Sequence, residues 1–297
     1  MNLTAERIDA MVTAFDLQFK NAYAAAGGVA EKFCVNVGDS AHSVVELPFF
    51  EAFSFMRKWV GPRQAKNLAT KKLILKEEAF EDTIGIPQRA IETDNWAIYS
   101  SAIAQMSTNA KLIWDQLALE ALCNPAAWID GKAFFGNSRK YGKSPIVNKA
   151  AAALNPESFN DAYETMMAYC GHDGNPLGVV PDTLMVGPKN RKTAFEILNA
   201  KLISDGTTTV DNPNLGLCEV IVNPRMVGDY ANYWFLMSCK GPIKPVALQK
   251  SKEPALTSLN RPTDANVFLE GQALFGTDAY GSAAAAFPHL VFAGIPA

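Results

Sequence analysis

Residues 94–124 read DNWAIYSSAIAQMSTNAKLIWDQLALEALCN, and the rest of the chain is organised around this stretch. Its apolar side chains recur at alternating intervals of three and four residues, which places them on one face of an α-helix. These residues are Trp96, Tyr99, Ile103, Met106, Ala110, Ile113 and Leu117. Thr93 suits the N-cap and Asp94 the first turn, whereas Asn124 before Pro125 ends the helix. The pattern predicts a spine helix about 45 Å long.

An apolar stripe at this spacing is also typical of a coiled coil. The run extends over only about four heptads, however, so a domain packed on the stripe is the favoured interpretation. We therefore expect the stripe to contact the core of its own subunit.

The segment upstream of this helix, residues 63–91, departs from ordinary globular patterning. We interpret it as a hairpin of two long strands joined near residues 76–78, the first strand basic and the second acidic at its start. It has too few apolar residues to pack on its own domain along its length, and two strands alone are marginally stable. Either it is a mobile arm or it lies on another copy of the protein. The candidate contact residues in and beside it are Trp59, Gly61, Arg63, Lys71, Lys72, Glu77, Glu78, Glu81 and Asp82.

The remaining periodicity predicts further elements on both sides of the spine helix. Helices are expected at 4–25, 49–60, 157–170 and 188–202, and strands at 181–187, 217–222, 233–239, 245–249, 267–269 and 290–293. Residues 29–48 lack clear periodicity and are expected to form an extended arm.

Composition limits the class of protein. The 297 residues are 48% hydrophobic and 19% charged, which is typical of a folded chain with ample core material. A net charge of −3 argues against a dedicated nucleic-acid binder. The five cysteines are scattered and odd in number, so we expect buried free thiols in a reducing compartment. Without a signal peptide or a long apolar run, a soluble cytosolic product with no membrane partner is expected.

Three stretches carry candidate chemistry. The loop from Gly136 to Ser144 has five residues between its glycines where a phosphate-binding loop needs four, so a surface loop is favoured. Cys170, His172 and Asp173 supply three potential metal ligands where a structural zinc site needs four.

The carboxylates Glu77, Glu78, Glu81 and Asp82 resemble an acid–base cluster, but a hairpin tip offers no pocket to shift their pKa values. The sequence therefore predicts no catalytic, cofactor-binding or metal-ligating residue, and no enzyme.

Several segments together resemble the major head subunit of Mu-like phages and prophages. The resemblance is carried by 59–63 (WVGPR), 80–84 (FEDTI), 91–94 (IETD), 130–135 (DGKAFF), 181–188 (PDTLMVGP) and 273–276 (ALFG). These matches occur in the order of that family over residues 5–280. The chain lacks the family's usual histidine after Phe134-Phe135, and it has Thr93-Asp94 where paired aspartates are common.

The resemblance implies an α+β protein with the Hong Kong 97-type capsid fold. The expected parts are an N-terminal arm (1–48), an extended loop region (49–92, with the hairpin at 63–91), a peripheral domain (93–154, with the spine helix at 94–124), an axial domain (155–265) and a return to the peripheral domain (266–297).

The function implied by the resemblance is that of a major capsid protein, whose copies form pentamers and hexamers in an icosahedral shell around phage DNA. Such a protein is found in the virion and, during assembly, in the host cytoplasm. Its implied partners are itself, the portal, scaffold or decoration proteins, and packaged DNA held non-specifically on the inner face. Two alternatives are an encapsulin-type bacterial compartment and, in another class, a cytosolic hydrolase that uses Cys170.

Overall fold

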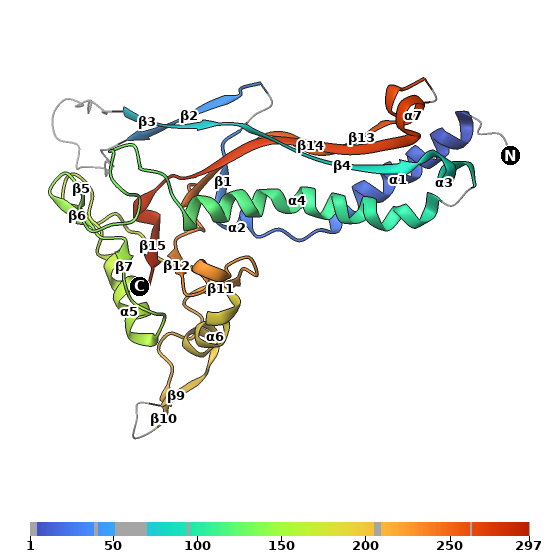
Figure 1. The fold of residues 1–297 in the computed structure, drawn as a ribbon. Coiled ribbons are helices and arrows are strands. Elements are labelled where there is room, and N and C mark those ends of the chain that lie inside the picture. The colour runs from blue at the N-terminus through green and yellow to red at the C-terminus, as the bar shows by residue number, and fades with distance from the viewer. Residues whose placement is uncertain are drawn as a thin grey trace.

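The computed structural model of the protein describes residues 5–38, 41–50, 70–93, 96–204, 209–261 and 263–296. Figure 1 shows a long arm and, below one end of it, a compact lobe. The described chain begins at the free tip of the arm and ends in the compact lobe.

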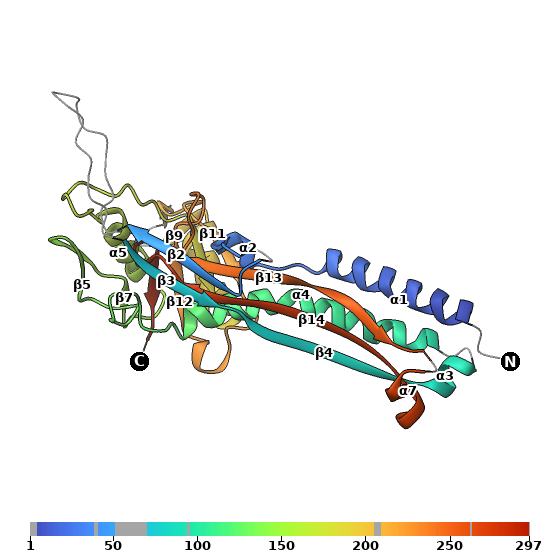
Figure 2. The same ribbon diagram turned by 90° about the horizontal axis from the view of Figure 1, so that it is seen from above.

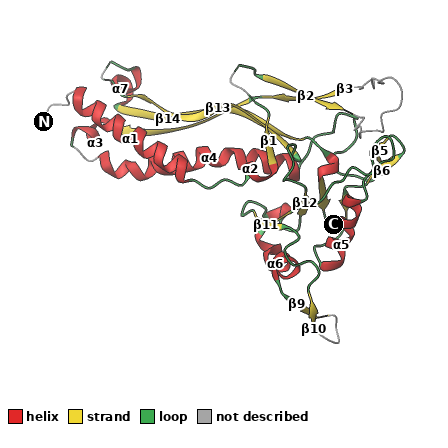
Figure 3. Cartoon of the chain, turned by 180° about the vertical axis from the view of Figure 1, so that it is seen from behind, coloured by secondary structure: helices red, strands yellow, loops and turns green. Residues whose placement is uncertain are grey.

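The arm is built on a four-stranded sheet. Its strands lie in the order β1 (Cys34–Asn36), β13 (Val246–Leu259), β14 (Gln272–Ala285) and β4 (Glu78–Pro87). β14 pairs antiparallel with both neighbours, and β1 pairs parallel with β13. Figure 3 shows the helices α1 (Ala5–Ala25) and α4 (Ser100–Cys123) on one side of this sheet. One face of the sheet is therefore covered and the other faces solvent.

The predicted spine helix is present as α4, preceded by the 3₁₀ turn η1 (Trp96–Tyr99). Ile103 and Met106 of the predicted stripe are buried. The other described members are half-buried, namely Tyr99, Ala110, Ile113 and Leu117. The side chain of Trp96 and residue Asp94 lie outside the described part. Trp114, which the stripe did not include, is among the largest fully buried side chains.

Two hydrophobic clusters result from this packing. At the arm tip, α1, α4 and the sheet enclose a core whose buried members are Met11, Phe15, Phe19, Ile86, Ile91, Ile103, Met106, Ala273 and Phe275. Closer to the lobe, a Cβ added to Gly281 would lie 2.3 Å from the carbonyl oxygen of Gln249 and 2.6 Å from the ring of Trp114. The small residues of β14 therefore allow α4 to approach the sheet closely.

The prediction that residues 63–91 form a hairpin of two mutually paired strands is wrong. Its two strands exist as β3 (Thr70–Lys76) and β4, but they do not pair with one another. β3 pairs antiparallel with β2 (Val44–Phe50), and β4 pairs over its whole length with β14. Only Glu77 separates them, so the chain continues from one strand into the next, as Figure 2 shows. The two-stranded β2–β3 unit is hereafter called the ribbon.

The compact lobe contains a five-stranded sheet. Its strands lie in the order β11 (Glu219–Val222), β8 (Thr183–Val186), β12 (Trp234–Met237), β15 (Val291–Gly294) and β7 (Lys149–Ala150). Helices α5 (Pro156–Met167) and α6 (Arg191–Asn199) pack on this sheet. α5 begins with a capping box, in which the Asn155 side chain accepts a hydrogen bond from the Ser158 backbone N–H at 2.8 Å. Two small hairpins extend from the lobe, β5 (Arg139–Tyr141) with β6 (Ser144–Ile146) and β9 (Leu202–Ser204) with β10 (Thr209–Asp211).

Short helices join these elements. They are α2 (Ala30–Phe33), α3 (Gln88–Glu92), α7 (Ala265–Glu270), η2 (Pro188–Asn190), η3 (Gly228–Tyr230) and η4 (Pro288–Leu290). The strand expected at 267–269 is thus part of helix α7. Of the helix expected at 49–60, the first two residues belong to β2 and the others lie outside the described part.

Both sheets combine strands from different segments of the expected domain division. β13, placed in the axial domain of 155–265, belongs to the arm sheet. β14 returns to the arm as expected for 266–297, but β15 then enters the sheet of the compact lobe, where it pairs with β12 and with β7 of the expected peripheral segment. The chain therefore passes between the two parts more often than consecutive domains would allow.

Candidate assembly interface

The ribbon contains two of the three predicted basic contact residues. Lys71 and Lys72 are exposed on β3, and Lys72 forms an ion pair with Glu46 on β2. Trp59, Gly61 and Arg63 lie outside the described residues. Ile74, on the same strand, leaves 62% of its surface exposed, although it is a large apolar residue. Val44, on β2, is 44% exposed, so the described part of the ribbon presents both cations and apolar side chains to solvent.

The end of the ribbon farthest from β4 is attached to the body by Phe49, which is 4% exposed and lies opposite Lys71. Its ring meets Trp128 edge-on, with centroids 4.7 Å apart, and lies 5.9 Å from Tyr141 and 6.1 Å from Phe287. Edge-to-face aromatic pairs add to the benefit of burial itself. Phe49 therefore fixes this end of the ribbon in an aromatic box, defined here as Trp128, Tyr141 and Phe287.

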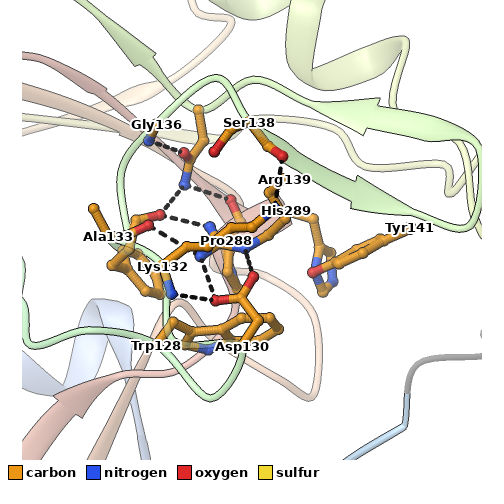
Figure 4. A network of polar contacts seen from close by, with 12 residues as sticks. Trp128, Asp130, Lys132, Ala133, Gly136, Ser138, Arg139, Tyr141, Pro288 and His289 are labelled. Atoms are coloured by element: carbon orange, nitrogen blue, oxygen red, sulfur yellow. Dashed lines mark hydrogen bonds and ion pairs between the residues drawn. The ribbon is translucent and has the colours of Figure 1, made fainter.

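An ion pair between buried Arg139 and half-buried Asp130 lies next to Trp128 of this box (Figure 4). The Arg139 side chain, 3% exposed, donates from Nε to Asp130 Oδ2 at 3.0 Å, and its guanidinium lies 4.6 Å from the centroid of the Trp128 ring. It also donates to the carbonyl oxygens of Phe134 and Ala133, at 2.7 and 3.0 Å. Burial alone would raise the pKa of Asp130, but the hydrogen bonds from Arg139 and from the Lys132 backbone hold that pKa below its ordinary value.

The same network joins the 128–148 segment to the chain that enters the lobe at 286–289. Asn148 donates to the carbonyl oxygens of Phe134 and Pro288, and Trp128 Nε1 donates to that of Ala286 at 2.9 Å. The Tyr141 hydroxyl and His289 Nδ1 are 3.1 Å apart. His289 is buried, and burial lowers its pKa to about 3. The imidazole is therefore neutral and structural.

Sequence reasoning missed this network because it interpreted 136–144 as a surface loop. Arg139 and Tyr141 are buried in the β5–β6 hairpin, whose turn contains Gly142 at a φ of 60°. The only available signal was the stretch 130–135, which contains Asp130, the partner of Arg139. This stretch entered the sequence-based prediction only through its family resemblance. Arg139 stands between the polar residues Ser138 and Lys140. This local sequence is the same whether the arginine is exposed to solvent or buried in an ion pair.

The predicted acidic residues lie on the arm and not at a hairpin tip. Glu78, Glu81 and Asp82 are exposed on β4, the last strand of the arm sheet, and Glu77 precedes it. Glu81 lies directly opposite Asp278 of β14. The structure therefore separates the acidic residues from the basic ribbon, which the sequence had placed side by side.

The candidate chemistry near Cys170 remains scattered. Among the described residues, no group of three His, Cys, Asp or Glu side chains is placed to hold a metal ion. Burial raises the pKa of the Cys123, Cys218 and Cys239 thiols to about 12, and it raises that of Cys34 as well. These four thiols are thus protonated at neutral pH.

No helix in the described part of the chain is both long enough and apolar enough to cross a membrane.

Comparison with known proteins agrees with the geometry. The family model of the Mu-like prophage major head subunit gpT matches residues 8–145, 141–226 and 224–295. The major capsid protein of Escherichia phage Mu is 20% identical, over 75% of this chain and 99% of that protein.

Two solved capsids share the architecture. The procapsid of bacteriophage JBD30 superposes with a TM-score of 0.61 at 18% identity, over 99% of this chain and 77% of that chain. The mature capsid of bacteriophage PhiM1 gives 0.61 at 11% identity, over 91% and 87%. The predicted Hong Kong 97-type fold is thereby confirmed.

Proposed function

Because the chain belongs to the family of the Mu-like prophage major head subunit gpT, we propose that it is a major capsid protein whose copies form an icosahedral phage head. The subunit is then a component of the virion and is assembled in the host cytoplasm. Its role is structural rather than catalytic. Its partners are first of all its own copies, in pentamers and hexamers.

The observation that supports this function is the distribution of apolar side chains. The subunit has two hydrophobic core clusters, yet Phe268 and Leu269 on α7 are 82% and 76% exposed, and Ile74 on the ribbon is 62% exposed. Helix α7 and the ribbon lie toward opposite ends of the molecule (Figure 1). Adjacent exposed apolar side chains mark contact surfaces. Contacts at several places on one subunit suit a closed assembly built from heterologous interfaces.

The ribbon is the element we assign to contacts between subunits. Its strands pair only with one another, whereas β4 belongs to the arm sheet. One side of the ribbon packs on its own subunit through Phe49 and Leu75. Its other side carries the exposed residues Lys72 and Ile74, and this is the side that we assign to a neighbour.

Further partners follow from the same proposal. A phage head also contacts a portal and scaffold or decoration proteins, and packaged DNA touches its inner face without sequence specificity. The negative net charge favours weak, non-specific contact with DNA over tight binding. An encapsulin-type compartment and a Cys170 hydrolase are not favoured, because the matching family is that of a phage head subunit.

The test compares the full chain with a variant in which 51–69 is replaced by a short Gly-Ser turn between Phe50 and Thr70. We expect the full chain, alone or with the scaffold protein of its prophage, to give closed shells in sedimentation and negative-stain microscopy. The variant should keep its circular dichroism spectrum but stay unassembled, because it loses the predicted contact residues Trp59, Gly61 and Arg63, and a stable interface needs about 1,000 Å². Absence of shells from the full chain under both conditions would refute the function.

A further inference from the structure

Gln249 is a fully buried polar side chain on the face of the arm sheet that α1 and α4 leave uncovered. It is 0% exposed. The next residue on β13, Lys250, points toward α4, because its Nζ lies 5.6 Å from the centroid of the Trp114 ring. Successive side chains of a strand alternate between its two faces, so Gln249 lies on the face opposite α4. Another part of the chain must therefore cover it.

The end of the ribbon nearest β4, where β2 begins and β3 ends, supplies this cover. Gln249 Nε2 donates to the carbonyl oxygens of His42 at 3.2 Å and Ser43 at 3.3 Å. The Ser43 oxygen also accepts from the backbone N–H of Glu77 at 3.0 Å. Ser43 precedes β2 and Glu77 follows β3. One carbonyl oxygen thus joins both strands of the ribbon to β13.

The amide of Gln249 is itself held in one orientation. The Ser282 hydroxyl on β14 donates to Gln249 Oε1 at 3.1 Å, and Gln249 Nε2 donates to Ser251 Oγ at 3.1 Å. The oxygen is therefore turned toward β14 and the nitrogen toward the ribbon. Burial of an amide is costly unless it is hydrogen-bonded, and here both of its ends have partners. An apolar side chain would fill the same space, so what the amide adds is the direction of its hydrogen bonds.

We propose that Gln249 is a positioning residue that fixes the direction in which the ribbon leaves the arm, an inference that rests on the proposed function. Leu73, Leu75 and Phe49 pack the ribbon on the body, but apolar packing has little directional preference. Hydrogen bonds to two successive carbonyl oxygens do define a direction. β2 extends about 20 Å from this point, so a rotation of about 10° there moves its far end by about 3 Å. Gln249 thereby determines where the exposed side of the ribbon meets a neighbour.

The experiment measures the direction of the ribbon in the full-length, unassembled subunit. Pulsed electron spin resonance gives the separation of spin labels at Ile74→Cys on the ribbon and Ala255→Cys on β13, both exposed positions. The background is Cys170→Ser, because the other four cysteines are buried. Gln249→Met keeps the length of the side chain and removes its hydrogen bonds. We expect one narrow distance distribution in the parent and, in Gln249→Met, about a tenfold larger population of displaced ribbon, because two hydrogen bonds to the ribbon are lost.

Two further variants distinguish positioning from a general loss of stability. Gln272→Met makes the same substitution at an exposed position of β14 near the arm tip and should leave the distance distribution unchanged. Ser282→Ala removes only the contact that orients the amide, so it should broaden the distribution less than Gln249→Met does. Ser282→Ala should have no further effect once Gln249 is Met, because the two residues act through one amide. Additive broadening in the double variant counts against the proposal.

Shell assembly by the same variants separates this inference from the proposed function. Gln249→Met should keep the circular dichroism spectrum of the wild type and yield fewer closed shells. An unchanged distance distribution in Gln249→Met overturns the positioning role, and so does a broadened distribution with a normal yield of shells. If Gln249→Met does not fold, an unchanged distribution in Ser282→Ala overturns the role instead. In each of these cases the proposed function stands as long as the wild type forms shells, and it fails if the wild type forms none, whatever the spin labels report.

Discussion

Replacement of Phe49 by Ala tests whether the ribbon is fixed to the body by the aromatic box. Phe49 is buried against Trp128, Tyr141 and Phe287. The other ribbon side chains that pack on the core are Leu47, Leu73 and Leu75. The substitution removes the ring and leaves a cavity beneath the end of the ribbon farthest from β4. Because the box is part of the body, the body should keep its fold.

The size of the effect follows from the burial of the ring. Truncation of a buried Phe to Ala costs about 3–5 kcal/mol, and loss of an edge-to-face pair is included in that range. A two-stranded ribbon is marginally stable by itself. The lost free energy is therefore lost from the packing of the ribbon on the body. About 3 kcal/mol increases the population of the undocked ribbon on the order of a hundredfold.

Hydrogen exchange measured peptide by peptide is the appropriate assay. In Phe49→Ala, amides of β2 and β3 should exchange much faster than in the wild type, whereas amides of α4 and β12 should be unchanged. Ile74→Ala is the control, because that side chain is 62% exposed and its loss should cost less than about 0.5 kcal/mol. Equal exchange in the two variants would refute the anchoring role. Faster exchange throughout the subunit would show that Phe49 belongs to the global core instead.

Two further substitutions test the helix and the buried histidine. Ala110→Pro removes a backbone hydrogen bond in the middle of α4 and clashes with the preceding turn, which costs about 3 kcal/mol or more. We therefore expect insoluble protein. Soluble, assembling particles would contradict the structural role of α4. His289→Asn tests pH dependence: burial lowers the pKa of His289 from 6.5 to about 3, so the unfolded chain binds more protons between these values. The wild type should thus be most stable above pH 6.5 and lose up to about 1.4 kcal/mol per pH unit as pH falls toward 3. Urea midpoints at pH 7 and pH 5 should differ less in His289→Asn, and an equal difference would count against a neutral buried imidazole.

The elements that the sequence predicted well are those whose hydrogen bonds are local. α4 and α5 were located because an apolar residue every three or four positions, Pro125 after one helix and Asn155-Pro156 before the other act within a single turn. The family resemblance added the fold, because it compares the order of many short segments and requires no knowledge of their contacts.

Strand partners and buried charges were decided only by the tertiary structure. β4 has an acidic start that resembles a turn next to β3, yet it pairs with β14, near the other end of the chain. β14 itself showed little signal, because its inward positions include Ala273, Thr277 and Gly281, kept small by the closeness of α4. Likewise, Arg139 can be buried because it forms an ion pair with Asp130 and lies over the ring of Trp128. The physical reason is that a helix satisfies its backbone within a few residues, whereas a strand or a buried ion requires a distant partner that local pattern does not identify.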